Sequence, residues 1–426
     1  MNARPGYKQT EIGDIPEEWQ VVRLNQVCRV RRGASPRPID DPSFFSAEGR
    51  GWIRIVDVTS TYKYLRKTTQ YLSQKGVSRS VQVDPGDLIM SICATIGKPV
   101  ILDMEACIHD GFVVFSELHT DTDSEYLFYV LQSKESEFVG KKQTGTQGNL
   151  NTTIVGKTAF ALPSLSEQQR IVSILATCDD EIQKTDEIIA KSQQLKKGLM
   201  QQLLTKGIGH TKFKQTEIGE IAEEWELDRL GNCLLSDPQN GIYKDQSFYG
   251  RGTSIVRIDD FYDGSFTSLS GFQRLELSDS EIATYMLRPR DILVNRVNSL
   301  PFLGKAVIVP ELAEPTAFES NMMKITTRPD RLLPEYTIAW LCAEHAKAHF
   351  LSRAKRAVAQ ASINQGDLCS LLVPVPTIAE QTEIIRVLQS AQEKLAREAE
   401  EKEQLTRLKK GLMQVLLTGK VRVKVN

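Results

Sequence analysis

An internal repeat constrains this chain more than any other feature of its sequence. The segment YKQTEIGDIPEEW at Tyr7–Trp19 recurs as FKQTEIGEIAEEW at Phe213–Trp225, an offset of 206 residues. A second segment, KKGLMQQLLT at Lys196–Thr205, recurs as KKGLMQVLLT at Lys409–Thr418, an offset of 213 residues. Self-similarity at a fixed spacing is the signature of repeated structural units. The 426-residue chain is therefore predicted to be a tandem duplication of a unit of roughly 210 residues, about the size of one or two domains.

Between these anchors the two copies diverge. Short marks of a shared scaffold survive, such as IRIVD at Ile53–Asp57 against VRIDD at Val256–Asp260. The residues around these marks do not match. Shared ends with unlike interiors indicate one fold that carries two different surfaces, and simple drift after duplication is the alternative interpretation.

Each copy ends in a long helical pattern. An S/T-x-x-E capping box follows a proline in both copies, at Ser164–Glu167 and at Thr377–Glu380, and predicts that each Glu bonds back to the N-cap amide. Apolar residues then recur every three or four positions, as in a coiled-coil seam, until Gly207 and Gly419, which we interpret as C-cap glycines. Each helix should span about 40 residues, or roughly 60 Å, and is expected to pair with its sister helix.

The predicted apolar stripe comprises Ile171, Ile174, Leu175, Cys178, Ile182, Ile189, Leu195, Leu199 and Leu203 in the first copy, and Ile384, Leu388, Ala391, Leu395, Leu405, Leu408, Leu412 and Leu416 in the second. Gly198 and Gly411 interrupt the helices at matching places. Glycine inside a helix costs about 1 kcal/mol. The pair therefore predicts a close crossing of two backbones, or of a backbone and a partner, and inheritance of one tolerated glycine is the alternative.

The segments between the anchors and the helices, residues 20–162 and 226–375, read as mixed α and β. Residues 81–100 show short apolar runs broken by turn residues, as strands do, whereas residues 125–132 and 334–350 have helical patterns. Each half is therefore predicted to be a compact globule followed by a long helix.

The composition excludes several classes of protein. With 53 Lys+Arg, 54 Asp+Glu and 41% hydrophobic residues, the chain is typical of soluble globular proteins. No apolar run reaches the ~18–20 residues of a membrane helix, and residues 1–5 do not resemble a signal peptide. The seven Cys form no C-x-x-C pair, which argues against structural zinc or a disulfide framework and predicts a cytoplasmic location.

Motifs of nucleotide-binding and catalytic proteins are missing from the sequence. It contains no P-loop, no G-x-G-x-x-G that opens a helix, and no Asn-Pro-Pro-aromatic motif of amino-methyltransferases. Among the five His, only His345 and His349 have helical i, i+4 spacing, and they lack the H-E-x-x-H pattern of a zinc site. The sequence argues against an enzyme that acts alone.

Basic residues cluster locally although the formal net charge is only −1. Between Arg23 and Lys67 there are ten basic and four acidic residues, and the stretch 347–356 carries four cations and no acid. Lys and Arg on loops suit phosphate contacts, and Arg also reads guanine edges. Next to each cluster lies a small polar loop, at 141–151 and 356–364. Both clusters are candidates for a nucleic-acid interface.

The two polar loops match at two positions, where Gln147 aligns with Gln360 and Asn151 aligns with Asn364. Gln and Asn can bind adenine bidentately. We favour a capping role for Asn151 and Asn364, because a residue that sets specificity should differ between the copies.

The repeated anchors, the PSLSEQQRI start of the first helix at Pro163–Ile171 and the KKGLMQ segments at both helix ends carry a resemblance. The chain resembles the specificity subunit of type I restriction–modification systems over its whole length and in the same order. The resemblance implies an α+β fold: a tandem duplication of a globular α/β target recognition domain followed by a long helix, with the two helices paired as an antiparallel coiled coil of pseudo-two-fold symmetry. The implied domains are residues 1–162, 163–207, 208–375 and 376–426, in the order recognition domain, spacer helix, recognition domain, spacer helix.

The resemblance also implies a function and partners. Each recognition domain would read one half of a bipartite site in double-stranded DNA, and the helix pair would set the spacing and dock two methyltransferase subunits. Two motor and endonuclease subunits would complete a restriction complex, without a membrane. The chain itself would be non-catalytic and bind no cofactor, whereas its partners would use S-adenosylmethionine, ATP and Mg²⁺. The alternative is a coiled-coil scaffold or adaptor that reads no DNA sequence.

Twenty residues, most of them in the basic clusters and polar loops, are the candidates for DNA contacts, and no residue is assigned a catalytic or metal-binding role. They are Arg31, Arg32, Arg37, Arg50, Lys63, Lys141, Lys142, Thr144, Gln147 and Asn149 in the first copy, and Asn240, Tyr243, Lys244, Arg251, Asn298, Arg353, Lys355, Arg356, Gln360 and Ser362 in the second.

Overall fold

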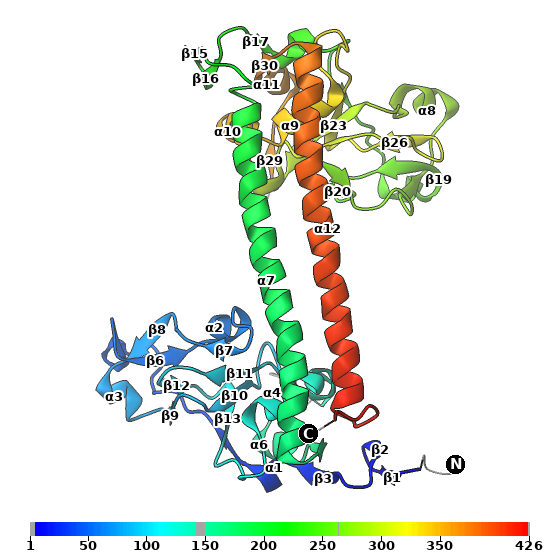
Figure 1. Cartoon of the computed structure of the whole chain (residues 1–426). Coiled ribbons are helices and arrows are strands. Elements are labelled where there is room, and N and C mark those ends of the chain that lie inside the picture. Colours follow the sequence, from blue (N-terminus) through cyan, green and yellow to red (C-terminus); the bar gives the residue numbers. More distant parts are fainter. Residues whose placement is uncertain (1–4, 142–149, 263, 359, 425–426) are drawn as a thin grey trace. The chain divides into compact units, whose positions relative to one another are not determined.

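The computed structural model describes residues 5–141, 150–262, 264–358 and 360–424. They form two compact units: unit 1 holds residues 1–186 and 400–426, and unit 2 holds residues 187–399. Each unit contains one globular part and a portion of both long helices, α7 (Leu165–Leu203) and α12 (Ile378–Leu416) (Figure 1). Each helix is 39 residues long, close to the predicted length.

The globular part of unit 1 is built on two five-stranded sheets. In spatial order the first holds β4 (Arg29–Arg32), β13 (Phe112–Ser116), β10 (Leu88–Ser91), β11 (Pro99–Leu102) and β7 (Tyr64–Leu65). The second holds β5 (Phe45–Ser46), β8 (Gln70–Leu72), β6 (Arg50–Ile53), β12 (Ala106–Ile108) and β9 (Val81–Val83). Two smaller pairs are β1 (Tyr7–Thr10) with β2 (Gly13–Pro16), and β3 (Gln20–Arg23) with β14 (Ala159–Leu162).

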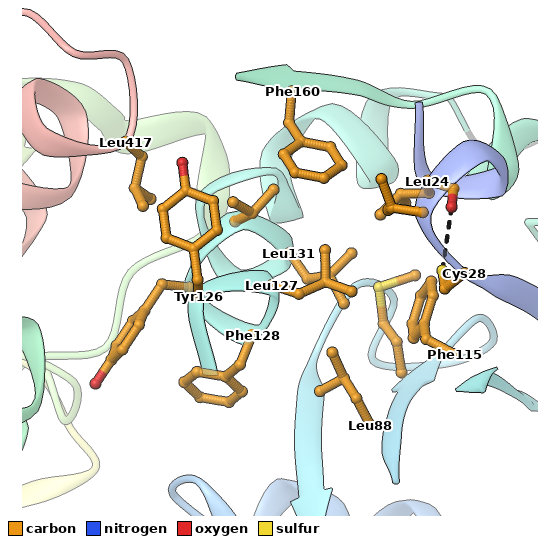
Figure 2. Close-up of a cluster of buried hydrophobic side chains, with 14 of the residues drawn as sticks. Leu24, Cys28, Leu88, Phe115, Tyr126, Leu127, Phe128, Leu131, Phe160 and Leu417 are labelled. Atoms are coloured by element: carbon orange, nitrogen blue, oxygen red, sulfur yellow. Dashed lines mark hydrogen bonds between the residues drawn. The ribbon is translucent and has the colours of Figure 1, made fainter. Parts of the chain in front are cut away.

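Short helices cover the sheets of unit 1: α1 (Leu24–Val27), α2 (Ile55–Thr59), α3 (Gln74–Val77), α4 (Ser124–Ser133), α5 (Glu135–Gly140) and α6 (Thr152–Gly156). Helix α4 begins at its N-cap Asp123, whose carboxylate accepts from the amides of Glu125 and Tyr126. Its apolar face packs between the sheet and the end of α12, where Figure 2 shows its side chains with Leu88, Phe115, Phe160 and Leu417. The strands β10 and β11 are buried over their whole length, so the core continues through the sheet.

Unit 2 has a four-stranded sheet with β18 (Gln239–Asn240), β27 (Met322–Ile325), β23 (Ile292–Asn295) and β25 (Ala306–Ile308) in that order. Two further sheets have three strands each. One holds β22 (Gln273–Leu275), β19 (Tyr249–Val256) and β26 (Thr316–Phe318), and the other holds β24 (Val297–Asn298), β29 (Ala361–Ser362) and β28 (Lys355–Arg356). The remaining strands form three pairs: β20 (Phe261–Tyr262) with β21 (Ser265–Phe266), β15 (Phe213–Thr216) with β16 (Gly219–Ala222), and β17 (Glu226–Arg229) with β30 (Leu372–Val375). Its helices are α8 (Asp279–Tyr285), α9 (Pro334–Leu341), α10 (Glu344–Arg353) and α11 (Gln365–Cys369).

The two globular parts share a strand plan. The order β4-β13-β10-β11 in unit 1 corresponds to β18-β27-β23-β25 in unit 2, and every neighbouring pair in both sets is antiparallel. The sequence marks IRIVD and VRIDD also share a local hydrogen bond, because the carboxylates of Asp57 and Asp260 accept from the amides of Arg54 and Arg257. The first mark continues into α2, whereas the second forms a turn. The scaffold marks found in the sequence are therefore marks of a repeated structure.

A buried glutamine ties the start of each long helix to its globule. Gln168 is inaccessible to solvent, donates to the carbonyls of Asp121 and Pro163, and accepts from the amide of Asp123. Gln381, 213 residues later, is equally buried and has the corresponding contacts with Arg331, Pro376 and Leu333. Sequence reasoning missed both residues, although each directly follows the glutamate of its capping box.

Only one of the two hydrogen bonds predicted for each capping box is present. The hydroxyls of Ser164 and Thr377 accept from the N3 amides, at 3.4 and 3.2 Å. The glutamates do not reach back to the N-cap. Instead, Glu167 accepts from the indole N–H of Trp19, at 3.0 Å, and Glu380 accepts from that of Trp225, at 2.9 Å. A buried indole N–H requires an acceptor, and the glutamate of the capping box meets that requirement in each unit.

The repeated anchor segments close each unit. In unit 1 the Tyr7 hydroxyl donates to the carbonyl of Gly419, at 2.8 Å, and Trp19 shares a core with Leu416 and Leu417. The first described residues therefore pack against the end of α12. In unit 2 Trp225 shares the corresponding core with residues 203–204 at the end of α7.

Parts of the helix predictions are wrong. A Cβ at Gly198 or Gly411 would meet nothing within 4 Å among the described residues, so no described backbone of this chain crosses there, whereas a crossing with a partner stays a prediction. Leu195 and Leu408, which are 213 residues apart, are 58% and 54% exposed and lie outside the buried stripe. The segment 334–350 forms two helices rather than one, because the backbone becomes extended at the residue that precedes α10.

Candidate nucleic-acid interface

Three predicted arginines of unit 1, all exposed or partly exposed, lie on and just after the edge strand β4. Arg31 and Arg32 pair in register with Val114 and Val113 of β13, which leaves their side chains at the sheet surface. The Arg32 Nε donates to the carbonyl of Asp110, at 2.7 Å. Within the described ranges, the Arg31 side chain has no hydrogen bond or ion pair, so its full guanidinium is available.

Arg37 lies on the loop that follows β4 and is held by the same acidic residue. Its Nη2 lies 3.3 Å from Oδ2 of Asp110, and 73% of its side chain is exposed. The Ser35 hydroxyl donates to Oδ1 of Asp110, at 2.6 Å. That hydrogen bond and the Arg37 charge keep the pKa of Asp110 below its usual range. Arg32 and Arg37, both held by Asp110, therefore form one exposed arginine cluster in unit 1, whereas Arg31, the preceding residue of β4, lies on the opposite face of that strand.

Two predicted residues of unit 1 are committed to the interior of its globule. Arg50 donates to the carbonyls of Val83 and Ala106, and its side chain is only 17% exposed. Lys63 is 7% exposed and pairs with Glu125. Both cations already have partners and little contact with solvent, so we do not retain them as DNA-contact candidates.

The polar loop of unit 1 is described only at its start and end. Lys141 follows α5 and pairs with Glu137. Lys142, Thr144, Gln147 and Asn149 lie outside the described residues. Asn151, at the far end, accepts from the amide of Ile154, at 2.8 Å, which confirms its predicted capping role.

In unit 2 four predicted residues meet on one small sheet. Strand β29 pairs with both neighbours, so that Ser362 faces Lys355 and Val297, and Ala361 faces Arg356 and Asn298. Arg353 precedes this sheet at the end of α10 and, like Lys355, Arg356 and Gln360, is exposed. Lys355 and Ser362 thus share one face of this sheet, and Arg356 and Asn298 share the other. Each face sets a cation beside a polar group, which suits contacts with phosphates and base edges.

A cap closes the polar loop of unit 2 as well. The Asn364 carboxamide accepts from the amide of Asp367, at 2.9 Å, and Asp367 accepts in return from the amide of Asn364, at 2.8 Å. The predicted capping role of Asn364 is confirmed.

The remaining predicted residues of unit 2 lie on β18, shortly after it, and on β19. Asn240 ends this strand, and Tyr243 is 81% exposed. Lys244 pairs with Glu281 at 2.7 Å, and its hydrogen bond lowers the pKa of that carboxyl to about 2. Arg251 is exposed and binds both oxygens of Glu276. Tyr243 is the accessible aromatic group of this set.

The described residues contain no group of three or more His, Cys, Asp and Glu arranged to hold a metal ion. Within the same parts of the chain, no helix has the length and apolar character that spanning a bilayer demands.

The family model for the type I restriction modification DNA specificity domain matches residues 16–191 and 282–407, one region in each copy. Among curated proteins, the chain is 27% identical to the type I restriction enzyme MjaVIII specificity subunit of Methanocaldococcus jannaschii, over 96% of this chain and 94% of that protein. It is 21% identical to the EcoKI specificity subunit of Escherichia coli K12, over 88% and 82%.

Solved structures agree in fold. A chain from a structure of a type I R-M system, described for its complex assembly and conformational transition, matches with a TM-score of 0.63 at 20% identity, over 96% of this chain and 99% of that one. The type I S subunit of M. genitalium matches with a TM-score of 0.52 at 12% identity, over 97% and 98%. The family model covers more than half of the chain. This protein therefore belongs to the family of type I restriction–modification DNA specificity subunits.

Proposed function

We propose that this non-catalytic chain reads a bipartite sequence in double-stranded DNA, with one half-site recognised by each unit. The observation that carries the proposal is that the two units repeat the same internal contacts but expose different side chains. Trp19–Glu167 and Trp225–Glu380 repeat one contact, whereas the exposed surfaces differ. Unit 1 offers an arginine cluster, and unit 2 offers a sheet with Lys355 and Arg356.

We infer that α7 and α12 pair as an antiparallel coiled coil, which relates the two copies by a pseudo-two-fold axis and sets the spacing between half-sites. Contacts inside each unit support this pairing. In unit 1 Asp186 pairs with Lys402 at 2.5 Å, and in unit 2 Ser192 bonds to Glu398 at 3.1 Å. Residue numbers thus rise along α7 as they fall along α12, which is the pattern of antiparallel helices.

The chemistry of modification and cleavage would come from partners. The relatives are named as subunits of restriction enzymes, and we propose that this chain docks two methyltransferase and two motor and endonuclease subunits in the cytoplasm. S-adenosylmethionine, ATP and Mg²⁺ would be bound by those partners rather than by this chain.

Mapping of adenine methylation in the host genome, with and without this gene, tests the proposal. One bipartite motif should lose its methylation when the gene is deleted. Exchange of residues 20–160 for those of a related protein should then change one half-site and leave the other intact. If both half-sites or neither changed, the assignment of one half-site to each unit would be wrong.

Charge reversal separates sequence reading from a scaffold role. Arg31→Glu and Arg356→Glu should each weaken DNA binding and reduce the salt dependence of log K by about 0.9 for each phosphate that the variant no longer neutralises. Lys184→Glu, on the exposed surface of α7, is a control for net charge. Unchanged binding and methylation in all three variants would favour the scaffold.

A further inference from the structure

We propose that Asp110 is a positioning residue that orients Arg32 and Arg37 of unit 1 toward the bases of its half-site. This inference rests on the proposed function, because it names a determinant of specificity in that same surface. Asp110 lies in the short loop between β12 and β13, and no sequence motif singles it out.

One residue organises the arginine cluster through three separate atoms. The Asp110 carbonyl accepts from Nε of Arg32, at 2.7 Å. Its Oδ1 accepts from the Ser35 hydroxyl, at 2.6 Å, and its Oδ2 from Nη2 of Arg37, at 3.3 Å. Asp110 therefore holds three positions along a segment that leaves the edge strand.

The loop that carries Asp110 is itself firmly seated. His109 is mostly buried against the rings of Trp52 and Phe112, and its Nδ1 accepts from the amide of Gly111, at 2.9 Å. The backbone of Gly33 lies so close to this loop that a Cβ on Gly33 would be only 2.2 Å from the His109 carbonyl oxygen. Loop and arginine segment thus form one rigid piece, and this rigidity lets Asp110 fix the direction of a side chain.

These contacts leave N–H groups of both guanidinium groups available to bind DNA bases. Arg32 uses only Nε, so both of its Nη groups remain for other acceptors. Arg37 uses Nη2 and keeps Nη1 and Nε. Guanine is read by two parallel N–H donors of one arginine, and an arginine that is oriented beforehand loses less conformational entropy when it binds.

A carboxylate on a DNA-facing surface also repels phosphates. If Asp110 served only to orient arginines, its neutralisation should lower discrimination between bases while leaving non-specific affinity equal or higher. Loss of the fold would instead lower both affinities, so the two roles predict different results.

The corresponding loop of unit 2 has no carboxylate at the position of Asp110. A Cβ at Gly241 would lie 2.2 Å from the Glu319 carbonyl, just as one at Gly33 would from that of His109, so Glu319 matches His109 and Ser320 matches Asp110. Glu319 is buried and bonds to the Ile258 amide and to Arg257 of its own scaffold. The carboxylate that holds exposed arginines is therefore a feature of unit 1.

The test compares Asp110→Asn with Asp40→Asn in the full chain, assembled with its methyltransferase partner. Asp40 is an exposed carboxylate three residues after Arg37 in the chain, without a side-chain partner in the described segments, so its variant removes equal charge. Binding is measured to the cognate duplex, to duplexes with single base changes in either half-site, and to unrelated duplex. Asp110→Asn removes the charge that holds Arg37 and keeps the main-chain carbonyl that holds Arg32, so it should lose tenfold or more of the discrimination at one position of one half-site, and Asp40→Asn should lose none.

A second comparison keeps the inference falsifiable if Asp110→Asn folds poorly. In an Arg32→Ala/Arg37→Ala background, Asp110→Asn should cause no further loss of discrimination, because the groups that it orients are gone. Unchanged discrimination in the single variant, or equal losses in both half-sites, would overturn the inference. A wild-type complex that does not discriminate between duplexes would overturn the proposed function instead.

Discussion

The two units attach their globular parts to the long helices in different ways. In unit 1 the buried Asp179 of α7 accepts from the hydroxyls of Tyr62 and Tyr129 and pairs with Lys409 of α12, at 2.6 Å. Lys409 also donates to Gln132 at the end of α4. A single polar network thus joins both helices to the globule, and its central ion pair is almost wholly shielded from solvent.

Unit 2 has the same helix contact without the buried charge. Gln392 occupies the repeat position of Asp179 and accepts from Lys196, the counterpart of Lys409, at an exposed site. The neighbouring tie to the globule is an ion pair between Lys197 and Glu344, at 3.4 Å, and both side chains are about 70% exposed. Exposed pairs contribute little to stability. The repeat therefore preserves the position of the contact, whereas burial decides its strength.

The largest expected effect is in the buried pair. Lys409→Met leaves the Asp179 carboxylate buried without its cation and should destabilise unit 1 by about 3–5 kcal/mol. The matched change, Lys196→Met, should cost unit 2 less than about 1 kcal/mol. Amide hydrogen exchange, read separately for the two units, measures both values.

Equal losses in the two units would contradict this comparison. So would a loss in Lys409→Met that spreads to the protected amides of unit 2, because the network lies inside unit 1.

A smaller effect, equal in the two units, is expected at the buried glutamines. Gln168→Ala and Gln381→Ala each remove an amide that satisfies two buried carbonyls and one N–H, so each should cost about 2–3 kcal/mol in its own unit. Gln169→Ala, at an exposed neighbouring position, is the control and should have no measurable effect. A marked difference between Gln168→Ala and Gln381→Ala in urea-dependent exchange would show that the helix starts are not equivalent.

The smallest effect has the opposite sign. Gly198→Ala and Gly411→Ala place a methyl group in open space on a helix and should each stabilise the isolated chain by about 0.5–1 kcal/mol. Destabilisation of the isolated chain would contradict the open surroundings at these positions. Weaker binding of a methyltransferase subunit by the same variants would assign these glycines to a partner contact.

Patterns that repeat along the chain were predictable because they depend on local chemistry. The periodicity of the apolar residues gave the two long helices, and the aligned Asn151 and Asn364 were correctly interpreted as caps, since a cap depends on a few neighbouring residues. The exposure of Leu195 and Leu408 was not predictable, because an apolar residue on a helix face is buried only where another element covers it.

The candidate DNA-contact residues were also predictable only in part. Sequence charge indicated the arginines on and after β4, but it could not separate exposed Arg31 and Arg37 from Arg50 and Lys63, which bond to the interior. Partners that lie far apart in the chain make that distinction, and they become neighbours only when the strands pair. Glu125, for example, is 62 residues from Lys63.

The sequence by itself determined that this protein is a duplicated unit with two long helices, because repeats and helical periodicity are properties of the linear chain. Only the tertiary structure decided which charges are free. Asp110 shows why: its three contacts reach residues 73 to 78 positions away. A hydrogen bond depends on distance in space, and folding alone brings those atoms together.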